Sequence, residues 1–312
     1  MKLRPFGNTG MQVSEIGLGA WQLANPDWGI NDTDEALQIV RKSFEAGCNF
    51  FDTAPGYGGG RSEELLGKGL KGIRKDVIIC TKFSHYDHGR RNFDAVNVRP
   101  VLEGSFKSLQ TDYVDMLLLH NPPRELMDGN NAPELYAELE QLKSEGKIRA
   151  YGISLDWRVE LETALDTTRS EAFEVFFNAL YQEPLPAFPR AQQQGAGIII
   201  KVPLDSGWLS GRYRKDSTFD DVRKRWSPEV IARRSALVEK FAEIIPQGTS
   251  LAHAALQFCL ARPEISSVIP GAKTVAQALD NFAAAEKQLP EESVQAIYKL
   301  WETEIESDPL PW

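Results

Sequence analysis

Asp52, Lys82 and His120 each end an apolar run, where a rigid element could present a functional group. Asp52 ends NFFD, Lys82 ends VIICTK and His120 ends VDMLLLH. Tyr57 follows Asp52 within the glycine-rich loop TAPGYGGG. These residue types suit the reduction of a carbonyl group. Hydride that reaches the carbonyl carbon leaves negative charge on oxygen, and a phenol next to a cation can protonate that oxygen.

Each side chain has a distinct task in this chemistry. Lys82 would lower the pKa of the Tyr57 phenol, and Asp52 would hold the ammonium group by a salt bridge. His120 would donate a hydrogen bond to the substrate oxygen, and in the reverse direction a tyrosinate would accept the alcohol proton. Taken singly, the residues also fit structural roles as a turn residue, a solvated lysine, a core histidine and a surface aromatic. Their expected convergence favours catalysis by a group of four residues: Tyr57, Lys82, Asp52 and His120.

Alternating strands and helices are the elements that must position these residues. A hairpin is expected to turn at residues 8–10. The apolar runs predict strands at 16–18, 49–52, 77–81, 114–119, 150–154, 175–177, 197–202 and 267–269. The 3.6-residue periodicity predicts helices at 32–46, 62–70, 98–109, 133–145, 159–167, 189–194, 228–245, 251–261, 275–285 and 290–304.

This alternation predicts an α/β fold in one domain, residues 1–312. Near-continuous apolar strands such as VDMLLL are typical of parallel sheets that are covered on both faces. Their repetition favours a (β/α)8 TIM barrel, with the hairpin at its start and extra helices after strand 7 and at the C-terminus. The alternative is a doubly wound sheet. Gly17 and Gly19 lack the third glycine of its dinucleotide fingerprint. In a barrel, the carboxyl ends of the strands carry the active site.

Composition and charge exclude several functional classes. The chain has 312 residues and a net charge of −9, which disfavours nucleic-acid and anionic-membrane partners. Cys48, Cys80 and Cys259 form no close pair, so we expect no metal site and a reducing, cytoplasmic location. The amino terminus lacks an apolar signal segment, and no run reaches the length of a membrane span.

Several segments of the chain, in order, resemble the aldo-keto reductase family. GCNFFDTAPGYGGGRSEELLGKGL resembles the signature around the catalytic Asp and Tyr, and IICTK, TDYVDMLLLHNP and GKIRAYGIS resemble the Lys, His and cofactor-amide segments. VPLDSGWLSGRY and SSVIPGAKTVAQALDN resemble the pyrophosphate and adenosine segments. The resemblance implies a (β/α)8 barrel, NADPH or NADH bound without a Rossmann domain, and reversible interconversion of carbonyls and alcohols.

The resemblance also implies which residues bind the cofactor. Ser154 corresponds to a contact with the nicotinamide amide, the segment after strand 7 to the pyrophosphate contacts, and the PGAKT segment to the adenosine contacts. PGAKT alone could equally be an ordinary strand-to-helix turn. The full set implied is Ala20, Trp21, Asp52, Ser154, Leu155, Asn178, Pro203, Leu204, Ser206, Gly207, Arg212, Gly271, Lys273, Gln277, Asp280 and Asn281.

The sequence departs from the family pattern at three of its positions. Leu155 replaces an asparagine at the amide, Asn178 replaces a glutamine on the sixth strand, and Lys201 replaces the aromatic residue that stacks on the nicotinamide. We expect NADPH as the cofactor, with NADH as the alternative, because Lys273 could accept the 2′-phosphate with help from Arg212 or Arg223.

The substrate is expected to be a small carbonyl compound or sugar that contacts Trp21, Trp28, Tyr57 and His120. The polar loops 83–97 and 122–131 would complete the rim and favour a sugar. We expect a monomer, with an oligomer left open. Three further functions remain open: a sugar dehydrogenase working in the oxidising direction, a Schiff-base lyase with Lys82 as nucleophile, and a non-enzymatic nucleotide sensor or channel-associated subunit.

Overall fold

Parallel strands form a closed central barrel in the computed structural model, which describes residues 1–25, 30–87 and 90–311. Each strand pairs with the next one in the barrel, and bridges from Ile16 to Val268 and from Gly19 to Gly271 join the last strand to the first. The predicted (β/α)8 barrel is confirmed. Its strands are β3 (Leu18–Gly19), β4 (Phe50–Asp52), β5 (Ile78–Phe83), β8 (Val114–His120), β9 (Ile148–Leu155), β10 (Ala172–Phe176), β11 (Gly197–Lys201) and β12 (Ile265–Val268).

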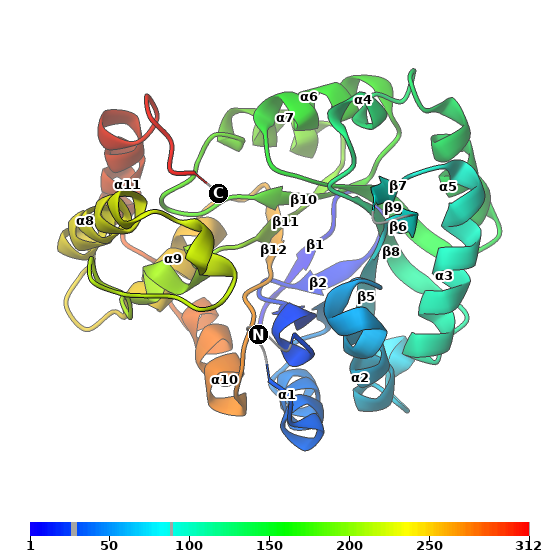
Figure 1. Ribbon diagram of the computed structural model, residues 1–312, viewed down its shortest axis with the longest axis horizontal. Coiled ribbons are helices and arrows are strands. Elements are labelled where there is room, and N and C mark those ends of the chain that lie inside the picture. Colours follow the sequence, from blue (N-terminus) through cyan, green and yellow to red (C-terminus); the bar gives the residue numbers. More distant parts are fainter. Residues whose placement is uncertain (26–29, 88–89, 312) are drawn as a thin grey trace.

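Helices surround the barrel on its outside (Figure 1). The α-helices are α1 (Thr33–Glu45), α2 (Arg61–Gly69), α3 (Ala95–Leu109), α4 (Arg124–Met127), α5 (Pro133–Ser144), α6 (Arg158–Thr167), α7 (Phe188–Gln193), α8 (Pro228–Ile244), α9 (Leu251–Leu260), α10 (Val275–Ala283) and α11 (Glu291–Glu304). The 3₁₀ helices are η1 (Ala20–Leu23), η2 (Tyr57–Gly60), η3 (Arg74–Asp76), η4 (Leu185–Ala187), η5 (Asp205–Ser210), η6 (Val222–Arg225) and η7 (Ala284–Glu286). The expected extra helices are α8, after β11, and the C-terminal α11, and the two pack against each other.

The segments 83–97 and 122–131, which we expected to be loops, contain secondary structure. Strands β6 (His85–Asp87) and β7 (Arg90–Asn92) pair as a short antiparallel hairpin, and α4 lies in the second segment. All three residues of β7 are polar, and two of them are exposed. The strand therefore lacks the alternation of apolar and polar residues by which a half-buried strand is predicted. Backbone hydrogen bonds alone define the hairpin, and the pattern of apolar residues could not reveal it.

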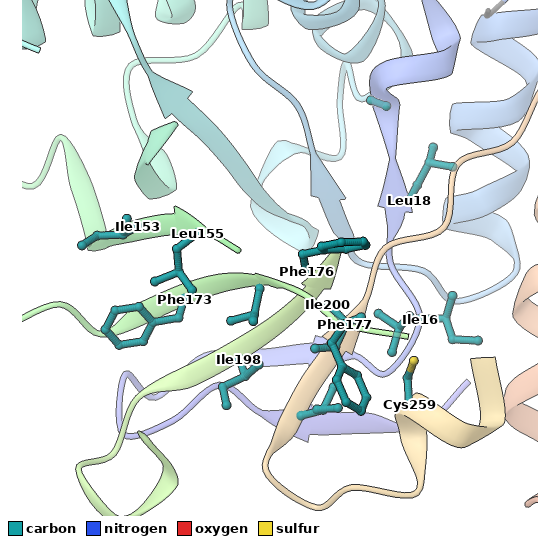
Figure 2. Close-up of a cluster of buried hydrophobic side chains, with 14 of the residues drawn as sticks. Ile16, Leu18, Ile153, Leu155, Phe173, Phe176, Phe177, Ile198, Ile200 and Cys259 are labelled. Atoms are coloured by element: carbon teal, nitrogen blue, oxygen red, sulfur yellow. The ribbon is translucent and has the colours of Figure 1, made fainter. Parts of the chain in front are cut away.

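Strand residues alternate between two separate apolar cores. Side chains that point outward pack against the surrounding helices, and Figure 2 shows part of this outer core, including Leu155, Phe173 and Ile198. Side chains that point inward form the barrel core, which includes Phe50, Ile78, Cys80, Met116, Leu118 and Ile199. The period of two in a strand therefore assigns neighbouring residues to opposite sides of the barrel wall.

The N-terminal hairpin closes the barrel at the amino ends of its strands. Its strands β1 (Leu3–Pro5) and β2 (Gln12–Ser14) pair antiparallel, as expected from the turn residues. Phe6, in the turn, is completely buried in the barrel core and its ring stacks on Phe50 with the centroids 6.5 Å apart. Water is thereby kept from the barrel interior at this end.

None of the helices in the described part of the chain combines the length and apolar character that a membrane-crossing segment needs.

The closure by the hairpin gives a stability prediction. Phe6→Ala should lower the free energy of unfolding by about 3–5 kcal/mol, because it removes a fully buried aromatic ring and leaves a cavity. Leu3→Ala is the matched control on the same hairpin, where the side chain is 51% exposed and the loss should be within about 0.5 kcal/mol. Urea denaturation of both variants measures the difference. Equal losses would show that the hairpin does not seal the barrel.

Candidate active site

A layer of polar side chains lies directly above the barrel core, towards the carboxyl ends of the strands. Each member follows an inward-facing residue by two positions, so it also points inward. Asp52 follows Phe50, Lys82 follows Cys80, and His120 follows Leu118. The layer contains the predicted Asp52, Lys82, His120 and Ser154, together with Glu174 and Lys201.

Lys82 is the centre of this polar layer. Its side chain is fully buried, and its Nζ lies 2.6 and 2.7 Å from the two carboxylate oxygens of Asp52. A third contact joins Nζ to the backbone oxygen of Thr53 at 3.1 Å. The predicted salt bridge between Asp52 and Lys82 is therefore present, and it is shielded from water.

Glu174 is a functional candidate that the sequence reasoning missed. It lies on β10 and is 3% exposed, with Oε2 3.1 Å from Lys82 Nζ. This contact lacks hydrogen-bond geometry, so it acts through charge. The signal in the sequence was a charged residue inside the apolar strand AFEVF. Because a carboxylate is rarely buried without a partner, its presence there indicated a cation nearby.

Two carboxylates therefore share one ammonium group in a dry site. Burial and the nearby Glu174 carboxylate raise the pKa of Asp52, against the effect of Lys82. Burial opposes ionisation of Glu174 as well, but Lys82 and then Lys201 hold the pKa of Glu174 below its ordinary value. The pair of carboxyl groups, Asp52 and Glu174, therefore keeps one proton up to a higher pH than two free carboxyl groups would.

Tyr57 lies over this charged cluster and beside two further predicted residues. Lys82 Nζ is 5.3 Å from the centroid of the Tyr57 ring. The ring of His120 meets Tyr57 edge-on with the centroids 5.7 Å apart, and Trp21 lies 6.3 Å away at a tilt. The structure thus brings together the four residues expected to be catalytic. Trp28, the other expected substrate contact, lies outside the described residues.

The surroundings of Tyr57 and His120 determine their protonation. Burial raises the pKa of the Tyr57 hydroxyl above its ordinary value; Asp52 and Glu174 act in the same direction, and Lys82 opposes them. Burial, together with the positive charge of Lys82, lowers the pKa of His120 to about 3. At neutral pH the phenol keeps its proton and the imidazole is uncharged.

Lys201 occupies the neighbourhood of Ser154, the residue expected to contact the nicotinamide amide. Its Nζ lies 2.9 Å from Ser154 Oγ, 3.0 Å from Asn121 Oδ1 and 2.9 Å from Asp156 Oδ1. Asn121 Oδ1 is also 3.0 Å from Ser154 Oγ. These four polar side chains lie together in the region where the family pattern places an aromatic residue and an asparagine that contacts the nicotinamide amide.

Leu155 and Asn178 do not present free polar groups to this region. The Leu155 side chain faces outward into the apolar core because strand residues alternate, and its expected place in a cofactor site stays a prediction. Asn178 is completely buried and both of its amide atoms bond to backbone, with Nδ2 donating to Val202 O and Oδ1 accepting from Leu180 N. Its side chain therefore braces the turn after β11.

The segment after β11, which contains Pro203 and Leu204, has an unusual backbone. Asp205 and Ser206 adopt positive φ values of 47° and 54°, a region that non-glycine residues rarely occupy, and Gly207 follows at 91°. Arg234, which is almost completely buried, forms an ion pair with Asp205. Ser206 Oγ is buried and has no hydrogen-bond partner among the described residues. Such a strained, braced loop with an unsatisfied polar atom indicates a binding site.

The segment after β12 lies beside η1, because Gly19 pairs with Gly271. A Cβ at Gly271 would meet the amide end of the Gln22 side chain, so the two segments approach closely here. Thr274 caps α10, as expected from the sequence, and Gln277 Oε1 accepts a hydrogen bond from the Lys273 backbone at 2.8 Å. The buried Asn281 donates to Gly271 O, so these predicted residues hold one another in place.

The charges around Lys273 are mixed. Burial lowers the pKa of Lys273, and the positive charges of Arg223 and Arg212 act in the same direction, so the three cations lie near one another. The acid Asp221 opposes them and forms an ion pair with Arg223. A further acid, Glu35, accepts a hydrogen bond from Val275 N at the start of α10. Asp280, also expected near the cofactor, instead pairs with His253 at 3.0 Å.

Asp52, Cys80 and Glu174 place potential metal-binding atoms within 4.8 Å of one another. Lys82 already bonds to Asp52 and lies 3.1 Å from Glu174, so its ammonium group supplies the positive charge of this cluster. The three cysteines are buried and unpaired, as their spacing indicated.

Comparison with known proteins identifies the family. The model of the Aldo/keto reductase family matches residues 15–302. The chain is 35% identical over 293 residues to L-galactose dehydrogenase from Arabidopsis thaliana, covering 91% of this chain and 88% of that protein. It is 28% identical to the NADH-specific methylglyoxal reductase of Escherichia coli, covering 91% and 93%. The holo form of an aldo-keto reductase from Bacillus halodurans superposes with a TM-score of 0.82, at 29% identity over 96% of each chain. The chain belongs to the aldo/keto reductase family of oxidoreductases.

Proposed function

We propose that this protein interconverts carbonyl compounds and alcohols with NADPH as its cofactor and Tyr57 as its general acid and base. The observation that carries the proposal is the buried Lys82, which holds Asp52 and lies 5.3 Å from the centroid of the Tyr57 ring. A phenol beside a fixed ammonium group, at the mouth of a barrel, is suited to deliver a proton to a carbonyl oxygen.

The residues around the mouth fit a dinucleotide cofactor. Leu204, Ser206 and Gly207 would hold its pyrophosphate, supported by the strained backbone and the unsatisfied Ser206 hydroxyl. The segment from Gly271 to Asn281 would hold the adenosine half, and Ser154 with Asn121 would hold the amide. When bound, the nicotinamide supplies or accepts the hydride.

The chain's own residues handle the proton. Tyr57 donates it to the substrate oxygen as negative charge develops there, and Lys82 stabilises the tyrosinate that remains. His120 is uncharged, so its N–H donates a hydrogen bond to the same oxygen without competing as an acid. Trp21 lies beside Tyr57, with the ring centroids 6.3 Å apart, and the two rings would pack against the substrate. The protonated state of Tyr57 at neutral pH suits the reducing direction.

A sugar dehydrogenase working in the oxidising direction is the second candidate. The similarity to L-galactose dehydrogenase over 91% of the chain supports it. Initial rates should be compared for aldoses, including L-galactose, with NADP⁺ and NAD⁺, and for methylglyoxal and aromatic aldehydes with NADPH and NADH. Faster reduction of the aldehydes supports the first candidate, and faster oxidation of an aldose supports the second. Absence of turnover in every combination would exclude both.

Tyr57→Phe should reduce turnover by about 10²–10⁴-fold, because it removes the general acid but keeps the ring. Cofactor binding, measured by fluorescence titration, should stay within about twofold, since Tyr57 acts on the substrate oxygen. Tyr136→Phe is the control, because the Tyr136 hydroxyl donates to Leu126 O and its ring packs in the outer core, outside the barrel interior. Turnover near the wild-type value in Tyr57→Phe would remove Tyr57 from the acid role.

His120 should remain neutral throughout the physiological range. Its pKa is lowered to about 3, so its ring signals in NMR should not shift between about pH 5 and pH 8, where an ordinary histidine titrates. The signals are assigned by their loss in His120→Gln. A His120 midpoint near pH 6.5 would contradict the neutral hydrogen-bond donor.

Lys273 and Glu35 should affect cofactor choice in opposite directions. Lys273→Ala should weaken NADPH binding by about 1–3 kcal/mol, roughly five- to 150-fold, and NADH binding much less, because only NADPH carries the 2′-phosphate. Glu35→Gln removes an acid from the start of α10 and should strengthen NADPH binding relative to NADH. Dissociation constants for both cofactors measure this. Equal changes for NADPH and NADH would show that neither residue reads the 2′-phosphate.

A further inference from the structure

Glu174 belongs to the buried polar layer and contacts Lys82, but it has no role in the proton transfer proposed above. It is attached to that layer on two sides. Oε2 lies 3.1 Å from Lys82 Nζ, and Oε1 accepts a hydrogen bond from Ser154 Oγ at 3.0 Å. A purely structural carboxylate in an apolar barrel would be costly, because an apolar side chain could fill the same space without desolvating a charge.

The contacts of Glu174 complete a continuous polar path across the barrel. It runs from Asp52 to Lys82, then to Glu174 and Ser154, and ends at Lys201. Lys201 is itself paired with Asp156, which is partly exposed at the mouth. The path thus links the buried ammonium group to the rim.

Asp52 and Glu174 approach Lys82 together and lie close to each other. Their carboxyl oxygens lie within 4.8 Å of one another, beside one ammonium group. Two ionised carboxylates this close repel each other in a dry interior, and one proton retained by the pair removes that repulsion. One ammonium group and two carboxyl groups that hold one proton form a cluster without net charge, which is the state that a dry interior favours.

We propose that Glu174 is a positioning residue of the active site: a second carboxylate partner of Lys82 that shares one proton with Asp52 and keeps Tyr57 in its proton-donating form. The partnership of Glu174 with Lys82 and Asp52 rests on their contacts alone. The effect of Glu174 on Tyr57 rests on the proposed function. The negative charge of Glu174 acts on Tyr57 against the positive charge of Lys82, so it makes the tyrosinate less stable.

Other charged groups also act on this cluster and must stay in place during a test. They are Asp52 on β4, Tyr57 on η2, Glu63 on α2, Cys80 and Lys82 on β5, Arg91 on β7, His120 on β8 and Lys201 on β11. Glu174→Gln removes the second carboxyl group, and with it one negative charge at any pH above the point where the shared proton dissociates, and it leaves all of these groups unchanged. Glu174→Asp keeps the charge on a shorter side chain.

The first measurement needs no catalysis. Carboxyl ¹³C NMR of protein labelled at Asp and Glu should show a carboxyl group that titrates above about pH 7, some three units above an ordinary aspartate. This signal should disappear in Glu174→Gln and persist in Glu174→Asp. Glu63→Gln is the matched control: Glu63 is also buried, but its carboxylate bonds to Thr81 outside the layer. The signal should persist there.

The second measurement is the pH dependence of alcohol oxidation. The midpoint assigned to Tyr57 should fall by about one pH unit in Glu174→Gln, a tenfold change in acidity, and return towards the wild-type value in Glu174→Asp. Glu63→Gln should leave the midpoint unchanged. A uniformly lower rate with an unchanged midpoint would mean that Glu174 is only structural and would overturn its effect on Tyr57.

The two measurements separate this proposal from the proposed function. If no substrate turns over, the function fails, and the NMR titration still decides whether Glu174 and Asp52 share a proton. If wild-type protein shows no carboxyl group titrating above about pH 7, the sharing is overturned. If Glu174→Gln does not fold, the wild-type and Glu174→Asp spectra decide the same question.

Discussion

The burial of one ammonium group is the constraint on which the rest of this structure depends. Moving such an ion out of water costs several kcal/mol even after the protein relaxes, unless partners of opposite charge surround it. Lys82 is fully buried and has two such partners, Asp52 and Glu174. Both must come from other strands, because no neighbour on β5 can reach the same point. The closed barrel is the arrangement that brings β4 and β10 to Lys82 together.

The same alternation along the strands builds both the dry floor and the charged layer above it. Phe50 lies two residues before Asp52, and Cys80 lies two residues before Lys82. Each apolar side chain therefore points into the barrel core directly below a polar one. The hairpin, with Phe6 at its turn, seals the opposite end. Low polarity beneath the layer strengthens its charge interactions, and that explains why burial dominates the pKa values of Tyr57 and His120.

Membership of the aldo/keto reductase family accounts for the barrel, and one of this chain's three departures from the family pattern, Lys201, adds a charge. Lys201 occupies a position where the family pattern has an aromatic ring, and it reaches Ser154, Asn121 and Asp156. Together with the buried Glu174, Lys201 makes the region proposed to hold the nicotinamide more polar than the family pattern implies. The braced loop after β11, with Arg234 fixed to Asp205, follows the expected position and adds a buried ion pair that no motif indicated.

The sequence by itself determined the order of the barrel strands and pointed to the four residues proposed to be catalytic. Apolar runs and helical periodicity are local signals, so the strands, helices and strand-end residues Asp52, Lys82 and His120 were predictable. Tyr57 followed from its place in the glycine-rich loop after Asp52, and the resemblance supplied the cofactor segments. The tertiary structure alone decided which side chains meet. Glu174 and Lys82 are far apart in the chain, and their contact depends on barrel closure and strand register. The direction of the Leu155 side chain was also decided by the structure, because a segment match does not state which face of a strand a side chain occupies, whereas alternation places it outside the barrel.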